Sequence, residues 1–226
     1  MTVEHPTNRV LAALAHGDRE HWRPHLERVD LLPGHTLLAP RTPIDFMVFP
    51  EGALVGLWHA GGSDGTEAPV ALVGDDGVVG IAPLLGAADQ RMRAEVLHPG
   101  AAWRLPVALL STHPSPGKGL LPVVLRYLQA LNAQMAQAAL CRLQHTPHQR
   151  MGRWLQDAFE RMPDTTLHIE PEALSAWLGA APKAVAQATE QWIAAGAISR
   201  GERGITLRDR EQLARRSCGC HQQVRE

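Results

Sequence analysis

The sequence lacks a large net charge, a long apolar run and a rich supply of cysteine. Its 226 residues contain 22 Lys and Arg against 23 Asp and Glu, a net charge of -1, which excludes a strongly basic, histone-like protein. A DNA-binding face remains compatible with this balance, because such a face needs clustered charge rather than net charge. No stretch approaches the roughly 18 uninterrupted apolar residues of a membrane span, so we expect no membrane partner.

The three cysteines all lie in the last 86 residues. An odd and small number of cysteines argues against a secreted disulfide scaffold and favours a protein of a reducing compartment. The N-terminus has no basic segment followed by an apolar one, so no signal peptide is expected and the protein is expected to be cytoplasmic. Hydrophobic residues make up 45% of the chain, enough for a sizeable core, and the length suits one large or two small domains.

Short apolar segments separated by Gly and Pro occupy residues 30–106. Segments this short and this frequent predict antiparallel strands in a sandwich or roll. Before them, Val10, Leu11 and Leu14 fall at helical spacing and predict a short helix.

Pro and Gly are both absent between Pro122 and Pro147, which predicts one helix of more than twenty residues. Apolar residues recur along it in alternating steps of four and three, a spacing typical of a seam between packed helices. One interpretation is a core helix of the same chain. We favour a homodimer seam, because both sides of the stripe are apolar. The expected dimer interface consists of Leu121, Val124, Leu125, Leu128, Leu131 and Met135.

Residues 146–207 predict a series of short elements. A Thr146 cap with Gln149 at the capping-box position begins one helix. Residues 170–207 then have the pattern of a helix, a turn at Gly179, a second helix and a β-hairpin, which is the order of a winged helix-turn-helix. The small core expected between the two helices comprises Ala176, Leu178, Val185, Ala188, Trp192 and Ile193.

In such a unit the second helix enters the DNA major groove. The residues expected to face base edges are Pro182, Lys183, Ala184 and Gln187. Arg200 and Arg203 on the hairpin are expected to meet phosphates or an adjacent minor groove, and Arg150 and Arg153 to add phosphate contacts. The alternative is a helical domain whose hairpin never touches DNA.

The whole chain from Asn8 to Leu213 resembles the Crp/Fnr family of bacterial transcription regulators. The segments that carry the resemblance are Asn8-Arg9-Val10-Leu11, Pro43-Ile44-Asp45-Phe46-Met47-Val48-Phe49-Pro50-Glu51-Gly52, Leu72-Val73-Gly74-Asp75-Asp76-Gly77-Val78-Val79-Gly80, Leu84-Leu85-Gly86 and His148-Gln149-Arg150. The resemblance implies an α+β chain with a cyclic-nucleotide-binding-like β-roll or jelly-roll effector domain (1–116), a long dimerisation helix (117–145) and a C-terminal winged helix-turn-helix DNA-binding domain (146–226). The partners it implies are double-stranded DNA, a second copy of the chain and RNA polymerase.

The effector domain departs from family members that bind cyclic AMP. Those members carry a Gly-Glu pair whose carboxylate accepts a ribose hydroxyl, and an Arg further on that neutralises the phosphate. Here Gly80 is followed by Ile81, which cannot accept that hydrogen bond, while Arg91 or Arg93 stands near the Arg position. Cyclic AMP is therefore not the expected effector. Another nucleotide such as a cyclic dinucleotide, or no effector, is expected in its place, and no cofactor is identified.

The second helix of the motif departs as well. Cyclic-AMP-type members use an Arg-Glu pair and a later Arg, and the matching positions here are Pro182, Lys183 and Gln187. Ala181 stands where the family has a capping Ser. Residues 147–226 hold 11 basic and 10 acidic residues, so DNA binding is expected to be weak or salt-sensitive. The alternative function is a family-derived protein with a drifted recognition helix that acts through protein–protein interaction.

Several strings resemble chemical motifs. Residues 61–65 match the G-x-S-x-G of serine hydrolases, but no helix can open after them, so we expect a hairpin turn. His21 and His25 lack a third metal ligand. Cys218, Cys220 and His221 lack a fourth, so the C-terminal cysteines are expected in a loose reduced tail. Cys141 is expected to be a small apolar residue of the long helix. No metal and no catalytic group are expected, and the chain is not expected to be an enzyme.

Overall fold

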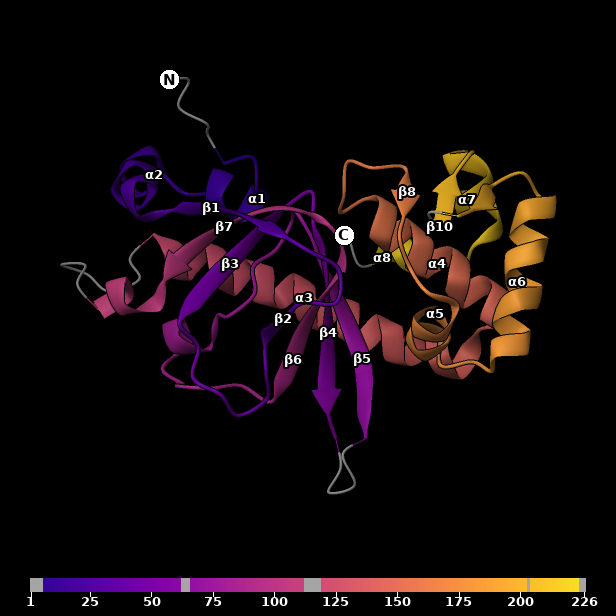
Figure 1. Ribbon diagram of the computed structural model, residues 1–226, viewed down its shortest axis with the longest axis horizontal. Coiled ribbons are helices and arrows are strands. Elements are labelled where there is room, and N and C mark those ends of the chain that lie inside the picture. The colour runs from indigo at the N-terminus through magenta and orange to yellow at the C-terminus, as the bar shows by residue number, and fades with distance from the viewer. Residues whose placement is uncertain (1–5, 62–65, 112–118, 203, 224–226) are drawn as a thin grey trace.

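The computed structural model describes residues 6–61, 66–111, 119–202 and 204–223, and it divides into a β-rich part and a helical part (Figure 1). The short helices of the first part are α1 (Arg9–Ala12), α2 (His16–Trp22), η1 (Arg23–His25), η2 (Ala82–Leu85) and η3 (Val107–Ser111). Its strands are β1 (Glu27–Leu31), β2 (Thr36–Leu38), β3 (Phe46–Glu51), β4 (Leu54–Ala60), β5 (Glu67–Val73), β6 (Met92–His98) and β7 (Gly100–Pro106). Every strand pair formed between them is antiparallel, as the short apolar segments predict.

The strands form two sheets, ordered β1-β7-β3 and β2-β6-β4-β5, which enclose a core rich in Val, Leu and Ala. β4 and β5 pair antiparallel on either side of residues 61–65, the arrangement expected of a hairpin, although residues 62–65 themselves lie outside the described residues. Asn8 closes the entry to α1, because its side chain accepts hydrogen bonds from the N–H groups of Val10 and Leu11 and donates to Pro50 and Gly77.

Helix α3 (Leu120–Gln144) runs from the roll to the helical part of the chain (Figure 1). Its 25 residues confirm the long helix predicted from the absence of Pro and Gly. Val124 and Leu131 are buried on the roll, and Leu128 and Met135 pack against the roll core beside them. Part of the apolar stripe of α3 therefore serves the core of its own chain.

The helical part contains α4 (Pro147–Phe159), β8 (Thr166–Leu167), α5 (Pro171–Leu178), α6 (Pro182–Ala194), β9 (Ile198–Gly201), β10 (Gly204–Leu207), α7 (Arg210–Arg216) and α8 (Cys220–Gln223). The three strands form a small sheet in the order β8-β10-β9. At the start of α4, Thr146 and Gln149 make the predicted capping box. Together with the roll, these elements confirm the α+β fold class and the C-terminal helix-turn-helix. Within the described residues, no helix is long and apolar enough to cross a membrane.

The segment after α7 is not the loose tail expected from the sequence. Cys218 and Cys220 are only 7% and 9% exposed, and His221 is buried against α4. Gly152 of α4 allows this close approach, because a Cβ there would lie 2.4 Å from the Ser217 hydroxyl. The sequence shows no periodicity over so short a segment, so its packing was not predictable from pattern.

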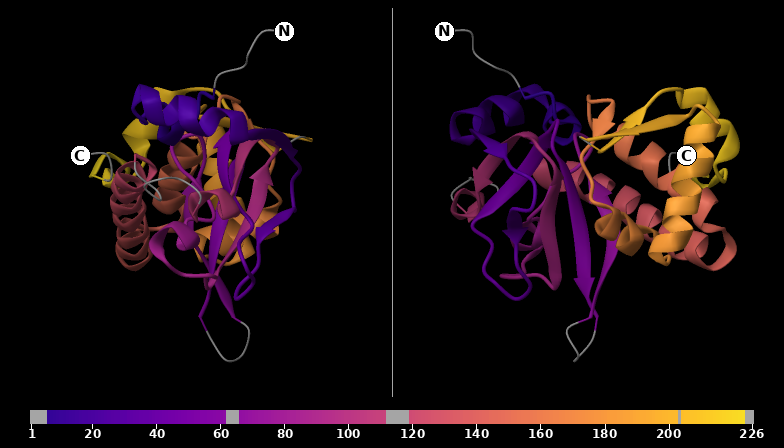
Figure 2. Two further views of the ribbon diagram at one scale, coloured as in Figure 1. Left: turned by 90° about the vertical axis from the view of Figure 1, so that its left-hand side faces the viewer. Right: turned by 45° about the vertical axis from the view of Figure 1, so that its right-hand side comes forward.

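The roll and the helical part share one hydrophobic core and lie side by side (Figure 2). Leu54 and Leu72 of the roll belong to the same buried cluster as Trp154 and Trp177. Arg142 donates a 2.7 Å hydrogen bond to the Pro69 carbonyl and strengthens this junction. The position of the helix-turn-helix relative to the roll is thus set by buried packing.

Candidate nucleic-acid interface

The turn between α5 and α6 forms because Gly179 adopts a left-handed conformation (φ 55°). A side chain there would be strained, whereas glycine allows the N–H groups of Gly179 and Ala180 to bond back to the carbonyls of Ala176 and Ser175. α6 begins directly afterwards with Pro182 at its first turn, a position where the missing N–H costs nothing. Ala181 precedes the helix and makes no side-chain cap, because its methyl group cannot accept a hydrogen bond.

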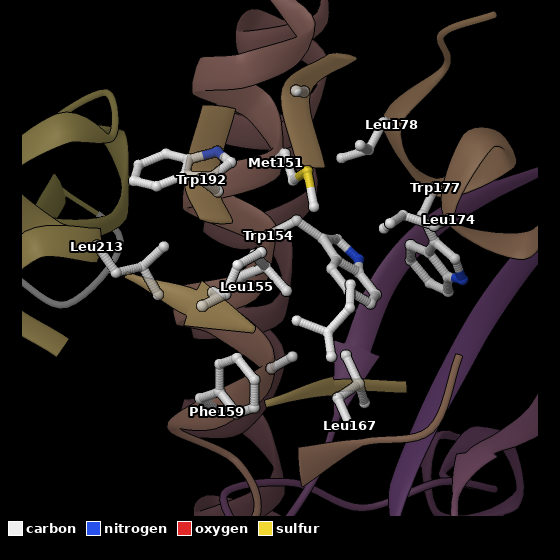
Figure 3. Close-up of a cluster of buried hydrophobic side chains, with 14 of the residues drawn as sticks. Met151, Trp154, Leu155, Phe159, Leu167, Leu174, Trp177, Leu178, Trp192 and Leu213 are labelled. Atoms are coloured by element: carbon white, nitrogen blue, oxygen red, sulfur yellow. The ribbon is translucent and has the colours of Figure 1, made fainter. Parts of the chain in front are cut away.

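Buried contacts on its inner face hold α6 in place (Figure 3). Val185, Ala188 and Trp192 belong to the core shared with α4 and α5. The Trp192 indole stacks on His148 at 4.3 Å, and its Nε1 donates a 3.1 Å hydrogen bond to the His148 carbonyl. Burial, together with the charge of Arg216, lowers the pKa of His148, so this ring is neutral near pH 7 and suited to stacking.

Trp177, not Ala176, completes the small core between the two helices. Trp177 is 6% exposed, whereas Ala176 is exposed at the surface. The sequence pattern placed Ala176 inside because it falls at helical spacing, but α5 also packs on the roll, and that second contact turns Trp177 inward. The edge-to-face contact of Trp177 with Trp58 of β4 at 5.3 Å accounts for this orientation.

The outer face of α6 carries the side chains expected to meet bases. Pro182, Lys183 and Gln187 are exposed, and Ala184 is half-buried. Glu190 is exposed further along the helix. The helix lies at the edge of the molecule away from the roll (Figure 1). Lys183 and Gln187 on its outer face are exposed among the described residues.

The wing consists of β9 and β10, in which Arg200 pairs with Ile205. Arg200 is exposed, and it also lines a cleft of about 460 Å³ between the wing and the roll, where Glu95 and Glu170 are further lining residues. Arg203, the other cation expected on the wing, lies outside the described residues.

Arg150 and Arg153 differ from their expected role as phosphate contacts. Arg153 is buried, and its guanidinium forms a 2.5 Å ion pair with Asp157 on the same helix, so it is not available to DNA. Arg150 is half-buried, with Nη1 3.5 Å from the Gly179 carbonyl. Both residues fall on the inner side of α4, a side that the sequence order alone does not reveal.

The structure shows the surroundings of each of the three residues expected at an effector site. Gly80 (φ 85°) lies against β3, where a Cβ would come within 2.5 Å of the Phe46 carbonyl oxygen. Arg93 is engaged on the sheet surface, since its guanidinium pairs with Glu67 at 2.7 Å and with Glu95, and lies over the Trp58 ring. Arg91 is exposed.

The residues expected at the dimer interface divide between two faces of α3. Val124 is fully buried and Leu131 is 6% exposed, so neither is available to a second chain. Leu128 and Met135 are half-buried against the roll core, and Leu121 is half-buried as well. Leu125 is 50% exposed and lies on the opposite face.

Residues 149–216 match the family model of the Crp-like helix-turn-helix domain. No curated protein sequence matches the chain. Among solved structures, FixK2 from Bradyrhizobium japonicum is similar over 85% of this chain and 98% of its own, with 15% identity and a TM-score of 0.69. A transcriptional regulator of the Crp/Fnr family from Eubacterium rectale is similar over 96% of this chain and 100% of its own, with 10% identity and a TM-score of 0.67.

A third similar structure is CLP of Xanthomonas campestris, described as a c-di-GMP responsive global regulator. It covers 86% of this chain and 100% of its own, with 15% identity and a TM-score of 0.64. At these identities the structures establish the fold. Together with the family model they confirm the resemblance that the sequence analysis describes.

Proposed function

The chain has the fold of the Crp/Fnr regulators and their helix-turn-helix domain, and we propose that it acts as a homodimeric, sequence-specific DNA-binding transcription regulator. The observation that carries the proposal is the exposed N-terminal half of α6, which is anchored on its inner face by Trp192 and Val185. A helix held in this way can enter a major groove without changing its angle. RNA polymerase at a nearby promoter is the further partner that we propose.

In the N-terminal half of α6, Lys183 and Gln187 carry hydrogen-bonding groups suited to base edges. A Lys ammonium donates to guanine acceptors, and a Gln amide can bond both groups of an adenine edge. Arg200 and Arg203 on the wing supply phosphate contacts, which fix the register of the helix without specifying sequence. With so few cations, we expect affinity to fall steeply as salt rises.

A second copy of the chain would place two recognition helices about 34 Å apart, one turn of the double helix. The exposed face of α3 is the surface that we propose for this contact. The exposed residues of this face are Leu125, Gln129, Asn132, Ala136, Leu140 and Leu143. They follow one another in steps of three and four, which is the spacing of a seam between two packed helices. Most residues of this seam follow directly after a residue of the seam expected from the sequence. Val124 and Leu131 of the expected seam face the roll instead.

We propose that the effector of this roll is a nucleotide other than cyclic AMP or that none is bound. Ile81 replaces the carboxylate that would accept the ribose hydroxyl. The Arg93 guanidinium already pairs with Glu67 and Glu95, so its charge is compensated within the sheet.

The experiment that tests DNA binding is a selection of duplexes by the purified protein, followed by affinity measurements at several salt concentrations. We expect Lys183→Ala to relax base preference and lower affinity roughly tenfold, about 1–3 kcal/mol for a lost base contact.

Arg200→Ala and Arg203→Ala should weaken binding to all DNA sequences alike and flatten the salt dependence of the affinity. Arg19→Ala on α2 removes an equal charge from a remote exposed position and should change nothing. Cyclic AMP should leave each affinity unchanged.

An alternative function is supported by the sparse charge of α6, which carries Lys183 and Glu190 exposed on the same helix. On this alternative the helix has drifted from base recognition, and the protein acts by binding other proteins. Absence of duplex binding at low salt, by a protein that is folded and dimeric, would contradict DNA recognition and favour this alternative.

A further inference from the structure

All three cysteines of the chain meet at one point together with a histidine. Cys141 lies in the last turn of α3, and His145 is the residue that ends that helix. Cys218 lies between α7 and α8, and Cys220 is the first residue of α8. The three sulfur atoms and the His145 ring nitrogen all lie within 4.8 Å of one another. Residues more than seventy positions apart in sequence thus form one compact set of metal-ligating atoms.

The distances within this cluster match those of tetrahedral coordination. The Sγ atoms of Cys141 and Cys218 are 4.0 Å apart, and the Cys220 Sγ lies 3.8 Å from the His145 Nδ1. Bonds of about 2.3 Å to sulfur and about 2.0–2.1 Å to nitrogen around a tetrahedral zinc ion require S–S edges of about 3.8 Å and S–N edges of about 3.5 Å. The ligand atoms need to move by only a fraction of an ångström to reach these values at the two measured edges.

The cluster is held in place by contacts that do not involve its sulfur atoms. His221 pairs with Asp157 at 2.7 Å and with Glu160 at 2.9 Å, which fixes the chain just beyond Cys220. Ser217 packs against Gly152 of α4 just before Cys218. The i, i+4 spacing of Cys141 and His145 brings those two side chains to one side of the helix end. These anchors form the geometry in advance of any ligand.

Burial and charge also suit a metal ion. Cys141, Cys218 and Cys220 are 1%, 7% and 9% exposed, so the site excludes most water, and His145 is half-buried at its rim. Three thiolates around a divalent ion leave one negative charge in excess. Arg142 and Arg150 line a pocket together with Cys141 and offer the opposite charge nearby.

A disulfide and a two-iron cluster each explain the arrangement less well. A disulfide between Cys141 and Cys218 requires sulfur atoms about 2.05 Å apart, and it assigns no role to the convergence of Cys220 and His145. A two-iron cluster divides its four ligands between two metal ions and sets the two pairs further apart than a single ion does. All four ligand atoms within 4.8 Å fit one ion.

We propose that Cys141, His145, Cys218 and Cys220 form a structural site for one zinc ion. Binding replaces three S–H bonds by three Zn–S bonds and uses the lone pair of the neutral His145 Nδ1. Up to three protons pass to solvent, and no electron is transferred. The ion joins the end of α3 to the segment after α7. It therefore fixes the short connection between α3 and α4 at residues 145–146. This inference stands independently of DNA binding.

The test uses the full chain, reduced and stripped of metal with a chelator, and titrated with Co²⁺ as a spectroscopic probe. We expect one Co²⁺ per chain, with the visible absorption of a tetrahedral site and a thiolate charge-transfer band, both abolished by an equimolar amount of Zn²⁺. Zn²⁺ should also release protons and protect all three thiols from a thiol reagent. Thermal unfolding should shift to higher temperature with the ion present.

Variants separate this site from adventitious binding. Cys218→Ser and Cys220→Ser should weaken Co²⁺ binding at least tenfold and reduce the charge-transfer band. His145→Ala should weaken binding while keeping that band, because the three sulfur ligands remain. His59→Ala, at an exposed position of β4, is the matched control and should bind like the unmodified chain.

Three outcomes would overturn the proposal. The first is a folded, reduced wild-type chain that shows no tetrahedral Co²⁺ spectrum and whose thiols react equally fast with and without Zn²⁺. The second is equal metal affinity in the wild-type chain and in His145→Ala, the substitution that leaves every buried sulfur in place. The third is two iron atoms per chain in the isolated protein. Since the first measurement uses the unmodified chain, misfolding of a variant cannot hide the answer.

Discussion

At the scale of single residues, Asp157 is where the buried charges of the C-terminal domain converge. Its carboxylate, 5% exposed, pairs with Arg153 at 2.5 Å and with His221 at 2.7 Å, and Arg161 lies 3.8 Å away. Burial by itself raises the pKa of Asp157, but the hydrogen bond from His221 and the charges of both arginines outweigh it, so the pKa lies below its ordinary value. The ionised form is therefore part of the folded structure.

This lowered pKa predicts how stability depends on pH. A carboxyl whose pKa is lower in the folded than in the unfolded state stabilises the fold above its unfolded pKa of about 3.9, and that contribution disappears as the pH falls through the folded value. Asp157→Asn should lose about 3 kcal/mol of unfolding free energy at pH 6, because it leaves Arg153 buried without its partner. Urea unfolding at pH 6 and at lower pH measures the loss, which should shrink as the pH falls below 4.

Asp89→Asn, at an exposed position of the roll, is the control for this prediction and should change stability by less than about 0.5 kcal/mol. A difference between Asp157→Asn and the wild-type chain that stays constant down to acidic pH would mean that the Asp157 carboxylate is not held in its ionised form.

At the scale of elements, α3 has one face buried on the roll and another that leaves several leucines exposed. The face with Val124 and Leu131 closes the roll. The opposite face leaves Leu140 41% and Leu143 86% exposed, together with Leu125. Exposed leucines are costly in water, and this cost supports the proposal that a second copy of the chain covers this face.

Leu143→Glu and Leu125→Glu should therefore weaken dimerisation. A charge placed in a seam of packed helices loses its hydration without gaining a partner, and we expect at least a tenfold weaker dimer, about 1.4 kcal/mol. Sedimentation at several protein concentrations measures the change. Leu32→Glu, at a leucine of the roll that is 54% exposed, should leave the dimer intact. A monomeric wild-type chain, or dimers insensitive to both seam substitutions, would refute this use of α3.

At the scale of the whole molecule, the roll and the helix-turn-helix domain are coupled through a shared core. Gly56 of β4 makes room for the Trp177 ring, since a Cβ there would lie 2.5 Å from its Cζ2 atom. Trp177 in turn belongs to the core beneath α6. The roll and the inner side of α6 are thus in contact through one buried core.

Gly56→Ala tests this coupling. The added methyl group must displace Trp177 or separate the two domains, and overpacking of this kind costs about 1–3 kcal/mol. We expect the thermal midpoint to fall by several degrees, about 2–4 °C for each kcal/mol in a chain of this size. Calorimetry measures the shift. Gly17→Ala, where an added Cβ meets nothing within 4 Å, should not lower the midpoint. An unchanged midpoint in Gly56→Ala would show that the junction is loosely packed.

The sequence by itself determined the local elements of this protein. Gly179 predicted the turn before α6, Thr146 and Gln149 predicted the start of α4, and the run without Pro or Gly predicted α3, because each depends on the conformational preferences of neighbouring residues. The resemblance to the Crp/Fnr family placed these elements in order. Lys183 and Gln187 could be assigned to an exposed face from helical spacing alone.

Only the tertiary structure decided which face of each element is covered. It turned Val124 and Leu131 towards the roll, buried Arg153 beside Asp157 and enclosed Trp177 between two domains. It also brought Cys141 and Cys218, which are 77 positions apart in the sequence, into one cluster. Burial depends on contacts between segments far apart in the chain, and no local pattern encodes which of two apolar faces another segment will cover.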